Sequence, residues 1–197
     1  MELFNICVRS VGYKITEKEH RMKEDDLISQ AIKDEQTTNS EWEFLGQKLI
    51  DGVQIKEVKN MPKNSGYLTE IFRMGWNLDE LKLNHVFQVV INPGCISAWH
   101  AHKVATDRLF VNIGMMRIAL YDDRESSPTN GMVNEFKFGS VRPALLIVPP
   151  EVWHGVQNIA SSQSAILNLC DHAYSYEDPD HWRLPHDATD IPFSFSD

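Results

Sequence analysis

The sequence predicts an all-β fold, an antiparallel sandwich or barrel, preceded by a short helical extension. Two observations lead to this prediction: from Gly52 onward, short runs rich in Val, Ile, Leu and Phe recur, and strong turn residues separate them. Many short strands at this spacing are typical of antiparallel sheets rather than of alternating strands and helices. The clearest runs lie at residues 85–91, 107–113, 117–122, 144–148 and 164–170.

Residues 1–50 have a different pattern and form the expected N-terminal extension to a β-domain at residues 51–197. Thr16 and Ser40 each begin a capping box, with a glutamate three residues later, and apolar residues then recur at helical intervals. Two short helices are therefore expected. The pattern does not decide whether they pack on the domain or serve as a dimerisation or lid element.

Composition excludes several classes of protein. A chain of 197 residues suits one domain with a sizeable core, and a formal net charge of −9 argues against nucleic-acid binding. The three cysteines lack CxxC spacing, which favours a reducing compartment and thus the cytoplasm. Since no run approaches 18 apolar residues and the N-terminus shows no secretory pattern, no membrane contact is expected.

A set of histidines is the most informative feature of the chain. His100 and His102 are two residues apart in a β-type run, so their side chains share one face. Asp107 opens the next run, and His154 follows about fifty residues later. If these side chains enter one cavity, three imidazoles and a carboxylate make a suitable site for a divalent transition metal.

The two histidine-bearing stretches resemble the paired motifs of the cupin superfamily, which implies a jelly-roll β-barrel. The first reads G-x5-H-x-H-x4-D-x6-G over residues 94–114, and the second reads P-x-E-x2-H-x3-N over residues 149–158. Two positions depart from the usual pattern: Asp107 stands where metal-binding cupins carry Glu, and Glu151 stands where the second motif has Gly.

A narrower resemblance covers roughly residues 52–195. Its motifs, in order, are 65–70, Trp99-His100, 123–131, 148–155, Tyr174, Tyr176 and 187–193. This succession is similar to the dTDP-4-dehydrorhamnose 3,5-epimerase family of nucleotide-sugar enzymes. The resemblance implies carbohydrate biosynthesis, a nucleotide-sugar substrate, a homodimer, and a reaction that needs neither metal nor redox cofactor.

The resemblance also implies catalytic roles. Epimerisation beside a 4-keto group needs a base, a cation near the enolate oxygen, and an acid on the opposite face. His100 stands at the family's base position, and Arg108 stands where the family has a lysine near the oxyanion. The aspartate that orients the base matches Asp187, with Asp190 or His186 as the alternatives if the alignment slips.

Other family positions differ in this chain. The family's tyrosine acid aligns with Asn168, so Tyr174 is the expected catalytic acid. Two arginines that hold the diphosphate in the family appear as Ser65 and Ser97. The side chains expected to bind substrate are His154, Arg73, Tyr176 and Arg142, with Arg117 as a further candidate.

Three functions are therefore compatible with the sequence. The first is a nucleotide-sugar epimerase or isomerase that acts on a 4-keto sugar without a cofactor. The second is a metal-dependent cupin enzyme, with His100, His102, Asp107 and His154 as ligands of a divalent transition metal. The third is a sugar-binding cupin that has lost its catalytic acid.

Overall fold

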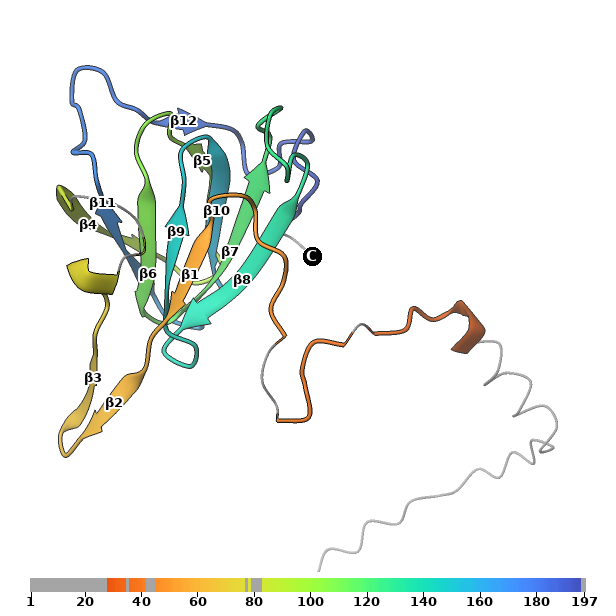
Figure 1. Cartoon of the computed structure of the whole chain (residues 1–197), viewed down its shortest axis with the longest axis horizontal. Helices are drawn as coiled ribbons and strands as arrows, with labels where there is room; N and C mark the ends of the chain where they lie inside the picture. The colour runs from red at the N-terminus through yellow and green to blue at the C-terminus, as the bar shows by residue number, and fades with distance from the viewer. Residues whose placement is uncertain (1–27, 35, 42–44, 77, 79–82, 196–197) are drawn as a thin grey trace, which may run out of the picture. The chain divides into compact units, whose positions relative to one another are not determined.

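A computed structural model describes residues 28–34, 36–41, 45–76, 78 and 83–195, and it is nearly all-β (Figure 1). The strands are β1 (Gln54–Glu57), β2 (Asn60–Lys63), β3 (Gly66–Thr69), β4 (His85–Ile91), β5 (Ile96–Ala101), β6 (Asp107–Ile113), β7 (Met115–Asp122), β8 (Val133–Gly139), β9 (Ala144–Val148), β10 (Val152–Asn158), β11 (Ser164–Cys170) and β12 (Trp182–Arg183). A short 3-10 turn, η1 (Met74–Trp76), follows β3. The predicted all-β class is confirmed.

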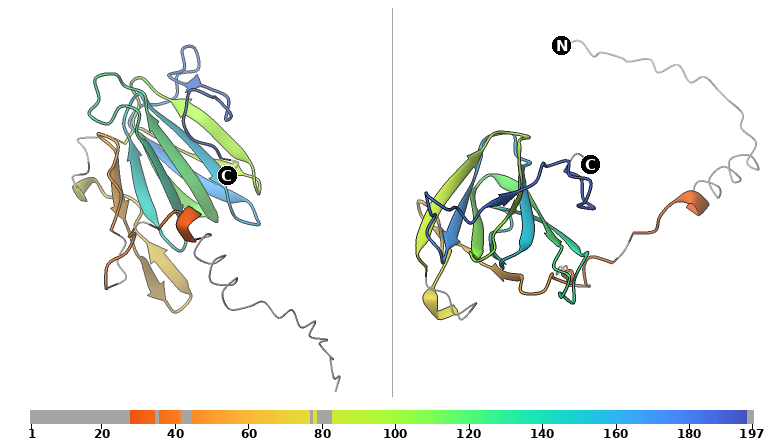
Figure 2. Two further views of the ribbon diagram at one scale, coloured as in Figure 1. Left: turned by 90° about the vertical axis from the view of Figure 1, so that its right-hand side faces the viewer. Right: turned by 90° about the horizontal axis from the view of Figure 1, so that it is seen from above.

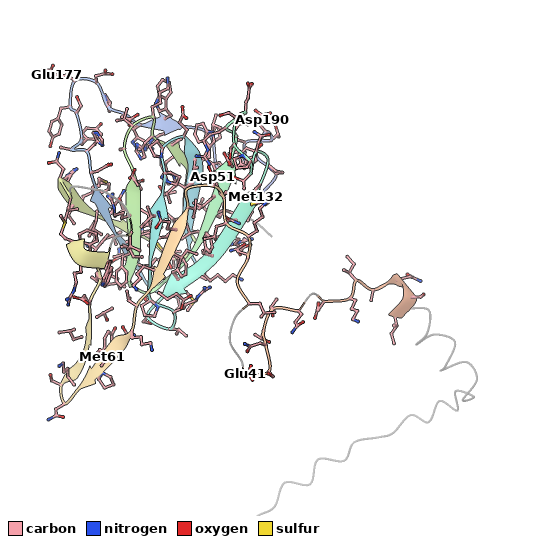
Figure 3. All side chains as sticks on the ribbon, in the orientation of Figure 1. Glu41, Asp51, Met61, Met132, Glu177 and Asp190 are labelled. Atoms are coloured by element: carbon pink, nitrogen blue, oxygen red, sulfur yellow. The ribbon has the colours of Figure 1, made fainter. Side chains whose placement is uncertain are left out.

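Two five-stranded antiparallel sheets build the domain (Figures 1 and 2). One sheet has the order β1-β9-β6-β11-β4 and the other has the order β12-β5-β10-β7-β8. They face each other across a shared core and are not closed into one hydrogen-bonded barrel among the described residues. A separate hairpin, β2–β3, projects from one end, where Figure 3 labels Met61.

The sheets are held together by apolar side chains from both inner faces. Leu146 and Val148 of β9 pack there against Ile118 and Phe136 of the opposite sheet. Leu145 of β9 points outward, into a second cluster with the segment that follows β3. Because both faces are covered, β9 is a continuous apolar run rather than an alternating one.

The tail after β11 covers the outer face of the second sheet. Phe193 and Phe195 pack on the buried Trp99 of β5, with ring centroids 5.9 and 5.3 Å away. This contact anchors the tail on the sheet. Trp99 therefore faces away from the inner side, where its neighbour His100 lies.

The turn between β6 and β7 requires glycine. Gly114 has φ +76°, and a Cβ there would lie 2.1 Å from Ser164 Oγ and 3.1 Å from Ser164 Cα. We expect Gly114→Ala to lower the free energy of unfolding by about 3 kcal/mol, since it adds a backbone clash to an unfavourable φ. Gly131→Ala is the matched control: its φ is +79°, but no atom lies within 4 Å of the added Cβ.

Thermal or urea unfolding of the two variants checks this expectation. Gly131→Ala should cost about 1 kcal/mol, because only the backbone conformation is unfavourable. Equal losses in the two variants would contradict the role assigned to the contact with Ser164.

The expected N-terminal helices are only partly within the described residues. Residues 28–30 form a helical turn, while 16–27 and 42–44 lie outside the described part. Residues 45–50 are not helical, which corrects the second expected helix. The reason is that Asn134 of β8 accepts a hydrogen bond from the Ile50 amide at 2.9 Å and donates one to the Lys48 carbonyl at 2.9 Å. Among the described residues, no helix is long and apolar enough to span a membrane.

Candidate active site

A cavity of about 470 Å³ opens between the two sheets, and the histidines line it. His100 and His102 come from β5, His154 comes from β10, and His181 comes from the tail just before β12. His100 and His154 are direct partners across the β5–β10 ladder, and their ring centroids are 6.0 Å apart. The side chains of residues 100 and 154 thus share one hollow, as the sequence pattern required.

His100 is held by a hydrogen bond on each ring nitrogen. Its Nε2 lies 3.0 Å from Ser97 Oγ, and its Nδ1 lies 2.9 Å from His181 Nε2. Burial lowers the pKa of His100 to about 3, and the charges of His154 and His181 act in the same direction. At neutral pH the imidazole is therefore uncharged, the form that can accept a proton.

Asp107 sits between two imidazoles on the other side of the cavity. Its Oδ2 lies 3.3 Å from His102 Nε2 and 3.1 Å from His154 Nε2, while Cys170 Sγ lies 3.5 Å from its Oδ1. Burial opposes ionisation of Asp107, but the hydrogen bonds from both histidines hold its pKa well below its usual range. Burial also opposes the charged form of His102, yet Asp107 raises the pKa of that imidazole.

Asp180 fixes the loop after β5 to the tail. Its carboxylate accepts hydrogen bonds from the backbone amides of Lys103, Val104 and Ala105 at 2.7, 2.9 and 3.1 Å. Its backbone carbonyl contacts His102 Nδ1. These contacts hold the loop beside the cavity, and they lower the pKa of Asp180 against the effect of burial. Sequence reasoning missed Asp180, because a tail without strand periodicity gives no signal for its position.

The structure places Asp187 away from His100. Asp187 and His186 line a separate hollow formed by residues 186–195, and they do not line the histidine cavity. The reason is the short strand β12, in which Arg183 pairs with His100. His181 directly precedes this strand and therefore lies against the His100 ring. The chain beyond β12 crosses to the outer face instead.

Arg108 does not face the cavity either. It follows Asp107 on β6 and so points to the opposite face of the sheet, where it is fully buried. Its guanidinium donates to the Leu169 carbonyl at 2.9 Å. Among the described residues, the arginine that lines the cavity is Arg183 instead.

The two tail tyrosines lie near the mouth of the cavity and are exposed to different degrees. Tyr174 lines the cavity and is half exposed, while Tyr176 is 92% exposed and packs edge-on against Tyr174. Figure 3 labels Glu177, the next residue, at the tip of this loop. Only Tyr174 is placed to meet a ligand bound between the sheets.

The arginines expected to bind substrate make ion pairs elsewhere. Arg73 pairs with Glu70, three residues earlier in the chain, and Arg142 pairs with Glu57 at 2.6 Å. Neither lines the cavity. Ser97 and Asn168, which stand at diverged family positions, do line it. Asn168 is buried, and its Oδ1 accepts a hydrogen bond from the Arg108 amide at 3.1 Å.

Comparison with known proteins decides the family. No family model matches the sequence. A curated relative from Haloferax volcanii, named "Probable low-salt glycan biosynthesis epimerase Agl13", is 32% identical over 139 residues, which are 70% of this chain and 89% of that protein. The chain belongs to the family of this glycan biosynthesis epimerase, and its fold is that of the dTDP-4-dehydrorhamnose 3,5-epimerases.

A second relative and a solved structure agree with this assignment. The spore coat polysaccharide biosynthesis protein SpsL of Bacillus subtilis is 31% identical over 151 residues, covering 75% of this chain and 97% of that protein. The crystal structure of a dTDP sugar isomerase from Desulfovibrio desulfuricans matches with a TM-score of 0.70 at 27% identity, covering 75% of this chain and 92% of the other. The expected resemblance to nucleotide-sugar epimerases is confirmed.

Proposed function

We propose that the protein is an epimerase or isomerase of a 4-keto nucleotide sugar and that His100 removes the proton next to the keto group. The observation that carries this proposal is the setting of His100, an uncharged imidazole in the cavity wall whose two ring nitrogens are both held by hydrogen bonds. A base that is held in a fixed direction and is uncharged, so that it can accept a proton, is the first requirement of the reaction.

The reaction runs through an enolate. The C–H bond beside the carbonyl breaks, its proton goes to His100 Nε2, and its electron pair moves into the enolate. If His100 Nδ1–H donates to His181, the Nε2 lone pair points toward Ser97 and the cavity. The low pKa of His100 makes it a weak base in the empty cavity, so negative charge on the bound substrate has to stabilise the imidazolium as it forms. Return of a proton to the opposite face gives the epimer, and Tyr174 is the proposed acid.

The arginine available to bind the substrate differs from those that the family resemblance implies. Among the described residues that line the cavity, Arg183 is the one arginine, and there is no lysine. It lies two residues after His181, which contacts His100. We propose that Arg183 contacts the diphosphate of the nucleotide sugar. The relatives are named for glycan and spore coat polysaccharide biosynthesis, so we propose that the product enters a polysaccharide or a protein glycan. The sparse, unpaired Cys95 and Cys170 agree with a cytoplasmic protein.

Product analysis tests the proposal. Purified protein is incubated with dTDP-4-keto-6-deoxyglucose and related 4-keto nucleotide sugars, and proton NMR couplings of the sugar ring follow the stereochemistry. We expect a new stereoisomer with at least one of these substrates. Ligand binding, seen as thermal stabilisation, without any change in the sugar would instead favour a non-catalytic sugar-binding protein.

We also propose that the chain forms a homodimer through the edge of the first sheet. β4 pairs only with β11 among the described strands, and Val86 and Val90 on it are each 50% exposed. An open edge with apolar side chains invites a second chain. Light scattering after gel filtration should give twice the mass of the chain, and Val90→Lys should shift it toward the monomer. A wild-type monomer at micromolar concentration would contradict this proposal.

A further inference from the structure

Asn168 presents an unused hydrogen-bond donor to the cavity. It lies on β11 between Ile166 and Cys170, and all three side chains line the cavity, as alternate residues of a strand do. Asn168 is only 5% exposed. Its Oδ1 accepts a hydrogen bond from the backbone amide of Arg108. Because a backbone N–H only donates, this contact fixes which end of the side-chain amide is the oxygen, and the NH₂ group must point the other way.

The NH₂ group of Asn168 has no acceptor among the described residues. A buried donor without an acceptor is costly, and native proteins rarely keep one without a reason. The buried Asn158 shows the usual situation, since its NH₂ group donates to the carbonyls of Ile91 and Ser162. Because Asn168 lines the cavity, a bound molecule can supply the missing acceptor.

The proposed reaction creates an oxygen that needs such a donor. As the proton moves to His100, the electron pair of the C–H bond enters the enolate and negative charge collects on the keto oxygen. A donor that is already oriented favours this enolate over the ketone, because it does not have to reorganise as the charge forms. We propose that Asn168 Nδ2 donates a hydrogen bond to the keto oxygen and stabilises the enolate, an inference that rests on the proposed function.

The positions of Asn168 and His100 suit these two roles. The C–H bond that breaks stands roughly perpendicular to the carbonyl plane, whereas the oxygen accepts its hydrogen bonds close to that plane. Base and donor must therefore approach the sugar from different directions. His100 comes from β5 and Asn168 comes from β11, strands of the two sheets that face each other across the core (Figure 1).

Asn168 also takes over the task expected of Arg108. The Arg108 guanidinium donates to the Leu169 carbonyl, away from the cavity, while its backbone amide holds Asn168 in place. An amide side chain stabilises the enolate without giving up a proton, because both hydrogens stay on Nδ2 throughout the reaction. The proton that completes the epimer must then come from another group, which agrees with Tyr174 as the proposed acid.

Infrared spectroscopy of the bound keto group tests this hydrogen bond without turnover. The probe is dTDP-4-keto-6-deoxyglucose with a ¹³C label at the keto carbon, bound to the His100→Asn variant, which lacks the base. A donated hydrogen bond weakens the C=O bond. We therefore expect the isotope-edited carbonyl band at lower frequency in this protein than in the double variant that also carries Asn168→Leu, a side chain of similar size without a donor.

Asn112→Leu in the same His100→Asn background is the matched control. Asn112 lies on β6 of the same sheet, donates to Gln88 and does not line the cavity. Its variant should leave the carbonyl band unchanged. A band at the same frequency with and without Asn168→Leu would overturn the role of Asn168. Failure of the labelled sugar to bind at all would overturn both this inference and the proposed function.

Steady-state kinetics separates the role of Asn168 from the epimerase function itself. Asn168→Leu should lower kcat by about 10²–10³-fold, the usual effect of removing one oxyanion donor, with little change in KM. Asn168→Asp keeps the oxygen that accepts from the Arg108 amide but has no NH₂ group, so it should melt like the wild type and be as slow. An active wild type whose Asn168→Asp variant folds and keeps its kcat, or changes only in KM, would overturn this inference and leave the epimerase function standing.

Discussion

Replacing His100 with Asn should lower the rate of epimer formation by a factor of about 10²–10⁴, the usual contribution of a positioned general base. Asn keeps the polar character of the side chain and can still bond to Ser97, but it cannot accept the proton. The free energy of unfolding should change little, because His100 is only partly buried and belongs to none of the apolar clusters. The measurement is kcat/KM from NMR progress curves, together with a melting curve of each variant.

His172→Asn is the control for this variant. It removes an imidazole from the lining of the same cavity, but one that pairs with Asp171 near the mouth and is more than half exposed. Its kcat/KM should stay within about threefold of the wild type, well below the contribution of a general base. If both variants lost the same activity, the effect would come from the general shape of the cavity, and His100 would not be the base.

Replacing Asp122 with Asn should lower the free energy of unfolding by about 2–4 kcal/mol. Asp122 is fully buried at the end of β7, and Arg124 pairs with its Oδ1 at 2.7 Å. Ser127 and Thr129 donate to its Oδ2 at 2.5 and 2.6 Å. The Asn side chain has no charge to pair with Arg124, and the hydrogens of its amide group would face groups that themselves donate hydrogen bonds. Asp123→Asn, at the exposed neighbouring residue, is the control and should change stability by less than about 0.5 kcal/mol.

The Asp122 effect should depend on pH. Burial disfavours the charged carboxylate, but the hydrogen bonds from Arg124, Ser127 and Thr129 hold the pKa of Asp122 well below its usual range. Because the pKa of Asp122 is lower in the folded state, its carboxylate stabilises the protein at pH values above the unfolded pKa of about 3.9. This contribution to stability is lost as the pH falls from that value toward the folded pKa. The difference in melting temperature between wild type and Asp122→Asn should therefore shrink from pH 6 toward about pH 3. A constant difference over this interval would contradict the assignment.

This network also explains one of the family motifs. Ser127 and Thr129 belong to the Ser-Pro-Thr-x-Gly turn that supported the resemblance to the epimerases. Their hydroxyls bind Asp122, and the Gly131 amide donates to the Asp122 carbonyl at 2.7 Å. The motif holds a turn and does not enter the cavity.

Most strands could be predicted because their signal is local. The runs at 85–91, 107–113, 144–148 and 164–170 coincide with β4, β6, β9 and β11. Period-two reasoning also placed His100 and His102 on one face, and both line the cavity. Glu151, which stands where cupins have glycine, indeed adopts φ 65°, the conformation that favours glycine.

The tail could not be predicted in the same way. Its position depends on β12, a two-residue strand that pairs with β5 and has no periodicity of its own. Family alignment therefore assigned the partner of His100 to Asp187, whereas the pairing of Arg183 with His100 brings His181 there. The prediction that Arg108 faces the substrate was wrong for a related reason. The alignment matched its position in the sequence, but the alternation of side chains along β6 points Arg108 away from the cavity.

Deuterium incorporation tests the central claim most directly, since proton removal by His100 requires exchange with solvent at the carbon beside the keto group. The candidate 4-keto nucleotide sugars are incubated with the protein in D₂O, and mass spectrometry with NMR locates the label. We predict deuterium at a carbon next to the carbonyl with the wild-type protein and at least about 100-fold slower incorporation with His100→Asn. A bound sugar that takes up no deuterium, or takes it up equally with both proteins, would contradict the account.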